Sequence, residues 1–152
     1  MPHRTRLVSA PGIARLALLA SLGAALAATG CGNTDTVTVG PAATFVADTF
    51  SGTLTLNGAQ TFLFTVSTTG SISAALTTLT SSAPGATVVP IGIALGTWNG
   101  AACQVVLASD AVLQSSSVPG QVNATGTFCL RVYDAIGTVT PPESYVITVT
   151  HP

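Results

Sequence analysis

The chain has 152 residues, of which only 6% are charged, and its formal net charge is −1. It contains no lysine, and three of its four arginines precede residue 16. Nucleic acids and anionic membrane surfaces are bound by clustered Lys and Arg side chains, so the remainder of the chain argues against both as partners. Solubility must come from Ser, Thr, Asn and Gln, which favours strands and turns over helices.

Basic and apolar residues follow one another at the start of the chain in the order of a secretion signal. Arg4, Arg6 and Arg15 come first, and a stretch rich in leucine and alanine runs from Leu16 to Gly30. A signal peptide has a positive n-region and an apolar h-region of about 7–15 residues. A helix that spans a bilayer needs roughly 20 apolar residues, so a retained transmembrane helix is the less favoured alternative. We therefore predict that residues 1–30 are a signal peptide.

The signal segment ends in Ala28-Thr29-Gly30-Cys31. This motif resembles the bacterial lipobox, in which small residues precede an obligatory cysteine, although the lipobox usually has leucine where this chain has Ala28. The resemblance implies cleavage before Cys31 and acylation of that cysteine. The protein would then be anchored by lipid in the bacterial cell envelope, at the outer membrane or the cell surface, and residues 31–43 would be a polar tether.

A conventional signal peptidase site offers an alternative. Ala25-Leu26-Ala27 satisfies the small-x-small rule, and cleavage there would release a freely secreted protein. The two cleavage sites therefore predict two localisations for the same domain: anchored to a membrane or secreted into the medium.

The chain has three cysteines, and an odd thiol in an exported protein needs a reason. Acylation of Cys31 leaves Cys103 and Cys129 as a pair, and disulfides persist in the oxidising compartments outside the cytoplasm. We therefore predict a Cys103–Cys129 disulfide, with two buried free thiols as the alternative. No metal or other cofactor is predicted, because the exported part has one histidine, His151, and no CxxC or HxxxH spacing.

Apolar residues after Phe45 alternate with Thr or Ser at period two, which indicates half-buried β-strands. Asn57-Gly58 predicts a hairpin after the first strand, since both residues tolerate a positive φ angle. Residues 89–95 are apolar on both faces, so this strand is expected in the middle of a sheet. The polar residues 115–120 are predicted to lie in a connection. The expected strands are residues 49–56, 60–66, 71–79, 89–95, 103–108, 121–124 (a weak edge strand), 127–134 and 144–150.

Seven or eight short strands separated by turns are typical of two antiparallel sheets packed face to face. With the signal removed, about 120 residues remain, which is the length of one domain. We therefore predict a single all-β domain, an antiparallel β-sandwich that spans residues 44–152.

Three blocks of this pattern resemble the bacterial pre-peptidase C-terminal (PPC-like) domain family, whose members are small jelly-roll-like sandwiches. The resemblance implies a non-catalytic domain, and some members bind polymers such as collagen or polysaccharide. This chain has no accompanying protease domain and no counterpart of the acidic calcium cluster of some members, so neither calcium nor collagen is expected. The blocks are residues 50–54 with 60–66, residues 93–96, and residues 126–134 with 145–149.

Catalytic residues are not expected. A serine or cysteine nucleophile needs a base, and His151 lies one residue from the end of the sequence, where chains fray. The carboxylates Asp110, Asp134 and Glu143 lie where turns or strand ends place acidic residues for solubility. We therefore predict that the protein is not an enzyme.

Aromatic residues outside the core are the candidates for ligand binding, because rings that stack beside polar groups hold sugars and peptides. Trp98 with its neighbour Asn99 is the first candidate, and Tyr133 with Arg131 and Asp134 is the second. The alternative interpretation is that Trp98 caps the end of the sandwich and Arg131 pairs with a nearby carboxylate.

Two functional hypotheses follow for the exported domain. The first is a tethered recognition or adhesion module for an extracellular polysaccharide or protein, which predicts an exposed Trp98. The second is a structural or assembly lipoprotein, which predicts a buried Trp98 and an apolar strand edge left open for a partner.

Overall fold

The computed structural model describes residues 44–152, which form eight β-strands and no helix. The predicted signal peptide, Cys31 and the tether 31–43 lie outside the described residues and stay predictions. The strands are β1 (Val46–Leu54), β2 (Ala59–Val66), β3 (Gly70–Ser81), β4 (Ile91–Trp98), β5 (Cys103–Val112), β6 (Ser117–Val122), β7 (Gly126–Tyr133) and β8 (Glu143–His151).

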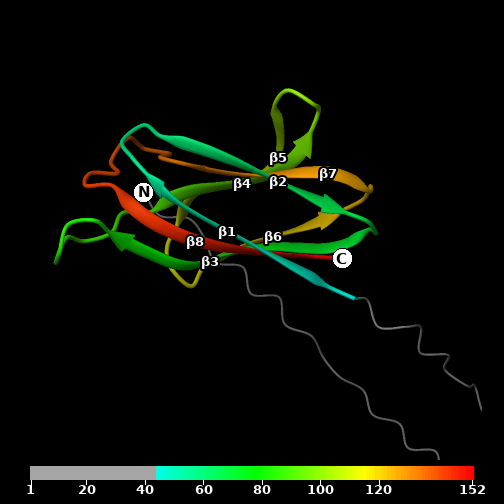
Figure 1. Ribbon diagram of the computed structural model, residues 1–152, viewed down its shortest axis with the longest axis horizontal. Coiled ribbons are helices and arrows are strands. Elements are labelled where there is room, and N and C mark those ends of the chain that lie inside the picture. Colours follow the sequence, from blue (N-terminus) through cyan, green and yellow to red (C-terminus); the bar gives the residue numbers. More distant parts are fainter. Residues whose placement is uncertain (1–43) are drawn as a thin grey trace, which may run out of the picture. The chain divides into compact units, whose positions relative to one another are not determined.

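The strands form two antiparallel sheets of four, with the orders β1-β8-β3-β6 and β2-β7-β4-β5 (Figure 1). We call them sheet A and sheet B. Strand β1 pairs with β8, β2 with β7, β3 with β6 and β4 with β5, so the chain is a folded ribbon of strand pairs wrapped into two layers. This is the pairing of a jelly roll. The predicted antiparallel, jelly-roll-like β-sandwich is therefore confirmed.

Alternate residues of each strand point between the sheets, as the period-two pattern predicts. The aromatic rings of Phe50, Phe62 and Phe64 gather there, and the centroids of Phe50 and Phe62 are 5.2 Å apart. Strand β4 lies between β7 and β5 and is buried on both faces from Ile91 to Gly96, since its inner side chains belong to the core and residues of β7 and β5 cover its outer face. The prediction of a central strand is thus confirmed. Each fully buried aliphatic side chain contributes about 1.5–3 kcal/mol by leaving water.

The predicted hairpin at Asn57-Gly58 is wrong. Asn57 does have a positive φ of 55°, and the amide of Gly58 donates to the carbonyl of Thr55 at 2.8 Å, so a tight turn is present. However, β1 belongs to sheet A and β2 to sheet B. The turn is a corner between the two sheets. Strands β1 and β2 bury their apolar residues in the shared core from opposite sides.

The boundaries of β5 and β6, an edge strand of each sheet, differ from the prediction. Strand β5 continues to Val112, four residues beyond the expected end, and β6 covers Ser117–Val122 in place of residues 121–124. Pro119 lies inside β6. An edge strand tolerates this proline because its missing amide proton faces away from the partner strand.

The expectation that the chain frays at His151 is wrong. His151 is 2% exposed, pairs with Val46 of β1, and places its Nε2 3.0 Å from a carboxylate oxygen of Asp48. Glu143 is also not a solvated turn residue: it is 2% exposed, and its Oε1 accepts a 2.7 Å hydrogen bond from the amide of Val89.

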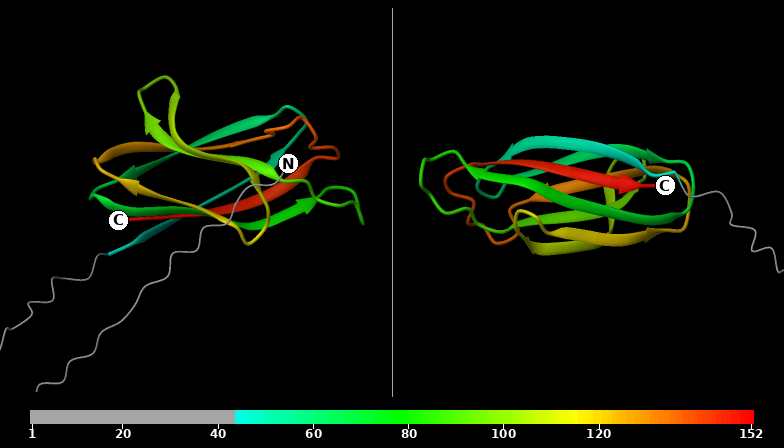
Figure 2. Two further views of the ribbon diagram at one scale, coloured as in Figure 1. Left: turned by 180° about the vertical axis from the view of Figure 1, so that it is seen from behind. Right: turned by 90° about the horizontal axis from the view of Figure 1, so that it is seen from below.

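Strands β4 and β5 form a hairpin whose tip stands out from sheet B (Figures 1 and 2). The predicted disulfide Cys103–Cys129 is confirmed, and it links the start of β5 to β7 across β4. Gly96 lies beneath this crossing, where a Cβ atom would overlap the backbone carbonyl of Gln104. The hairpin can therefore cross here only because residue 96 has no side chain.

The disulfide is expected to supply a large part of the domain's stability. It joins residues 26 positions apart, a loop for which the chain-entropy model gives about 3.5 kcal/mol. We predict that the double variant Cys103→Ala/Cys129→Ala lowers the free energy of unfolding by about this amount, measured by urea denaturation. The variant Cys31→Ser is the control and should leave this free energy unchanged. A loss below about 1 kcal/mol in the double variant would contradict the prediction.

Candidate binding surface on sheet B

Strand β7 directs two of the predicted site residues onto the outer face of sheet B. Phe128, Leu130 and Val132 point into the core, and the alternating positions Arg131 and Tyr133 point outward. Arg131 is exposed and Tyr133 is half-buried. The structure therefore places a ring and a guanidinium side by side on a sheet surface.

Tyr133 reaches across the sheet because its neighbour in β4 is glycine. It pairs with Gly92, where a Cβ atom would lie 2.6 Å from two ring atoms of the tyrosine. Beyond Gly92, the Tyr133 hydroxyl donates a short hydrogen bond to the carboxylate of Asp110 on β5. Asp110 lies at an irregularity of β5, between the partners of Ile91 and Ile93. The ring thus bridges β7 and β5 over the bare backbone of β4.

Arg131 interacts with this ring and not with a carboxylate. Its Cζ atom is 5.9 Å from the Tyr133 ring centroid, within the range of a cation–π interaction. The one salt bridge among residues 44–152 joins His151 and Asp48. The alternative in which Arg131 pairs with a nearby carboxylate therefore has no counterpart in the part of the chain that the structure describes.

Asp134 has backbone partners for both of its carboxylate oxygens. Its oxygens accept hydrogen bonds from the amides of Asn57, Gly137, Thr138 and Val139 at 2.9–3.3 Å. Desolvation raises the pKa of this carboxyl, but these four amide hydrogen bonds outweigh it and hold the pKa below its ordinary 3.8. Asp134 thus ties the β1–β2 corner to the loop between β7 and β8.

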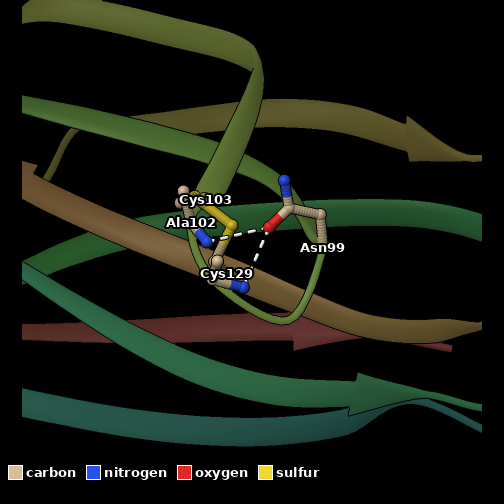
Figure 3. The surroundings of a disulfide bond; sticks show 5 residues. Asn99, Ala102, Cys103 and Cys129 are labelled. Carbon is tan, nitrogen blue, oxygen red and sulfur yellow. Dashed lines mark hydrogen bonds between the residues drawn. A yellow bond between two sulfur atoms is a disulfide. The ribbon is translucent and has the colours of Figure 1, made fainter.

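Trp98 and Asn99 lie at the tip of the β4–β5 hairpin. Trp98 is half-buried and pairs with Cys103. The Oδ1 atom of Asn99 accepts hydrogen bonds from the amides of Ala101 and Ala102 at 3.0 and 2.8 Å, beside the disulfide (Figure 3). Asn99 therefore shapes the turn at the hairpin tip.

The five predicted site residues do not form one site. Trp98 lies six residues beyond Gly92 in β4, roughly 20 Å along the strand from the row that holds Tyr133. Arg131 and Tyr133 come together on the sheet, Asp134 follows at the end of β7, and Trp98 with Asn99 lies at the other end of β4. The candidate surface is the cluster of Tyr133, Arg131 and Asp110, which we call the Tyr133 surface.

Sequence reasoning missed the part that Asp110 and Gly92 play in this surface. Asp110 was expected in a solvated turn, because β5 was predicted to end two residues earlier. An acidic residue that continues the alternation of a strand is a signal that could have placed it on the sheet. The contact across Gly92 has no local signal, since it depends on the register of three strands.

Residues 44–152 contain neither a metal-binding cluster nor a membrane-spanning helix. No group of His, Cys, Asp or Glu side chains in this range is placed to hold a metal ion. None of these residues forms a helix that is long and apolar enough to cross a membrane.

Comparisons with known proteins leave the chain without an assigned family. No protein-family model matches it, and no curated protein matches its sequence. The Yersinia pseudotuberculosis-derived mitogen (YPM) is similar in structure with a TM-score of 0.48 and 12% identity, over 70% of this chain and 86% of its own. Aeromonas hydrophila PliG, a periplasmic lysozyme inhibitor of g-type lysozyme, gives a TM-score of 0.45 and 11% identity, over 68% and 83%. The resemblance to the PPC-like family stays a prediction.

The contact between Tyr133 and Asp110 has a spectroscopic consequence. Burial, followed by the hydrogen bond to the Asp110 carboxylate, raises the pKa of Tyr133 from 10.0 to about 12. The folded state therefore favours the neutral phenol, so the stabilisation is complete below pH 10 and is lost as the pH rises through about 12. In a Tyr145→Phe chain, where Tyr133 is the one remaining tyrosine, we predict that tyrosinate absorbance appears with a midpoint near 12. Asp110→Asn should move the midpoint toward 10.0, and an unmoved midpoint would contradict the assignment.

The amide cluster around Asp134 predicts a loss of stability in acid. Because its pKa is lowered in the folded chain, the stabilisation is present above the ordinary value of 3.8 and is lost as the pH falls through the folded-state pKa. We expect Asp134→Asn to lower the free energy of unfolding by about 1–3 kcal/mol at pH 7, with a smaller difference from the wild type in acid. Urea denaturation at both pH values measures this. Asp35→Asn, in the predicted tether, is the matched control and should show no such difference.

Proposed function

We propose that this protein is an exported bacterial lipoprotein, anchored in the cell envelope through Cys31, whose β-sandwich recognises an extracellular polysaccharide without catalysing a reaction. The Tyr133 surface is the proposed binding site. A protein ligand for the same surface, and free secretion in place of anchoring, are the alternatives that the experiments below separate.

The observation that carries this proposal is the tyrosine ring held across Gly92 between two polar groups. Asp110 fixes the ring through its hydroxyl, and Arg131 lies within 5.9 Å of the ring centroid. Binding sites for sugars combine an apolar ring face, on which a pyranose stacks, with a few polar groups that fix its orientation. The ring supplies that face, and the carboxylate and guanidinium supply an acceptor and donors.

A non-catalytic role is supported by what surrounds the titratable groups. His151 is buried against Phe64 with its ring centroid 5.2 Å away, and its Nε2 is bonded to Asp48. Asp134 is occupied by backbone amides, and Glu143 is buried with a bond to Val89. His151 and Asp134 are thus engaged by the fold, and Glu143, whose Oε2 has no hydrogen-bond partner, is 2% exposed and so lies out of reach of a substrate in solvent.

A structural or assembly lipoprotein is the second candidate function. Val105 and Val106 are 49% and 78% exposed on β5, which is an edge strand of sheet B. Unpaired apolar edges are where another chain adds a strand. Trp98 does not separate the two functions, because it is neither fully exposed nor fully buried.

Binding of polysaccharides by full-length protein in native envelope fractions tests the recognition proposal. We predict that Tyr133→Ser and Arg131→Ala each weaken binding to a responding polysaccharide by at least about tenfold, on an array of neutral and acidic polysaccharides. Ile136→Ser changes an exposed apolar residue in the β7–β8 loop and is the control that should bind as the wild type does. Absence of binding across the array, or equal loss in the control, would contradict the proposal.

Metabolic labelling with palmitate tests the anchoring separately. The wild-type chain should carry the label and remain in the membrane fraction, and Cys31→Ser should lose the label and enter the soluble fraction. A labelled Cys31→Ser chain would contradict lipidation at this residue, and an unlabelled wild-type chain would favour free secretion.

A further inference from the structure

An apolar cavity of about 390 Å³ opens between the edge strands β5 and β6. Its polar lining groups are Thr97, Gln121 and Asn123, and no charged side chain lines it. Ligand pockets have volumes of roughly 300–1,000 Å³, and an engineered apolar cavity of about 150 Å³ holds benzene. The cavity is therefore large enough for an apolar ligand. Its apolar lining side chains are Ile72, Leu95, Val106, Leu107, Val122 and Phe128.

The course of the β4–β5 hairpin accounts for this opening. The backbone of β5 crosses over Gly96 and is held there by the disulfide. The first half of β5 therefore lies on the outer side of sheet B. At the same place the β4–β5 register shifts between Leu95 and Gly96, and Val106 is the residue without a partner. Leu107, on the inner face of β5, is thus only partly buried on the side of β6.

The cavity lies at the end of the sandwich where β1 begins. Val46, the first residue of β1, pairs with His151, and Ile72, which lines the cavity, pairs with Gly120 at the same end of sheet A. A second hollow of about 250 Å³, lined by Phe45, shares Ile72, Gly120 and Gln121 with the cavity. Figure 1 shows the start of β1 at the same end as the turn from β6 to β7. The cavity and the second hollow therefore both lie near the point where the chain enters the domain.

We propose that this cavity binds one acyl chain of a bilayer lipid. The proposal rests on the anchoring in the proposed function, because the tether from Cys31 enters the domain at the end where the cavity opens. Residues 32–45 span at most about 50 Å when fully extended, so the cavity stays within reach of the membrane. The lipid headgroup remains outside, beside Gln121 and Asn123.

The chemistry of the lining selects an acyl chain over a sugar. Hydroxyl groups inside the cavity would lose their hydrogen bonds to water, since the lining offers few polar partners. A hydrocarbon chain gives up no hydrogen bonds on entry, and it removes the apolar surface of the lining side chains from water. The cavity and the Tyr133 surface therefore take different ligands.

The experiment uses the Cys31→Ser chain, which has no lipid of its own, and monomyristoylglycerol, an uncharged lipid with one acyl chain. Native mass spectrometry and titration should show one lipid per chain, and glycerol alone should not bind.

Two variants test the cavity as the binding site. Val106→Glu places a charge at the cavity without disturbing the core, because Val106 is 78% exposed. Ala124→Trp places a large side chain at the opening of the cavity from an exposed turn position. Both should weaken binding at least about tenfold. Ile136→Glu, the same change at a 63% exposed residue away from the cavity, should bind normally.

A second arm identifies the source of the acyl chain. The lipidated wild-type chain, reconstituted in phosphatidylglycerol vesicles with a photoreactive acyl lipid, should form crosslinks to residues 117–124. Lipid uptake by the Cys31→Ser chain without such crosslinks would identify the protein's own anchor as the occupant and overturn the proposal. No uptake, or equal loss in Ile136→Glu, would also overturn it. Polysaccharide binding at the Tyr133 surface and palmitate labelling are read separately, so a failure of the cavity is distinguishable from a failure of the proposed function.

Discussion

The close approach of the Gln104 backbone to Gly96 is the contact on which the β4–β5 hairpin and the neighbouring cavity depend. Glycine at this position lets β5 cross over β4, and the Cys103–Cys129 disulfide holds the crossing in place. The same crossing carries Trp98 out of the sandwich and buries Cys129, which points outward from its sheet. It also leaves Leu107, on the inner face near β6, only partly buried. A larger residue at position 96 would therefore alter the hairpin, the disulfide and the cavity together.

Glycine has a second use on the same strand. Gly92 leaves the space in which Tyr133 reaches Asp110, four residues before Gly96. Strand β4 thus has no side chain on its outer face at either position. Tyr133 of β7 covers Gly92, and the backbone of β5 at Gln104 covers Gly96. The Tyr133 surface and the cavity lie at opposite ends of β4, so a ligand at one leaves the other accessible.

The period-two pattern was sufficient to predict the fold class and the inward faces of β2, β3 and β7, and the apolar residues on both faces of β4 were sufficient to predict its central position. These properties depend on burial along one strand, which the local sequence records. The corner at Asn57-Gly58 was misread because a tight turn has the same residues whether it joins two strands of one sheet or two layers. The Tyr133–Asp110 contact was missed because it needs the register of β7, β4 and β5. Disulfide pairing was accessible, since only two cysteines remain after Cys31.

The position of the last strand bears on how the domain folds. Of the eight described strands, β8 comes last in the sequence, yet it lies between β1 and β3 and is the partner of β1 in sheet A. Sheet A therefore cannot close before β8 has been made, and long-range pairings of this kind form slowly. A domain whose first strand must wait for its last stays open until that strand is available. If the protein is exported as proposed, such a delay would suit it, because a translocon threads polypeptides in the unfolded state.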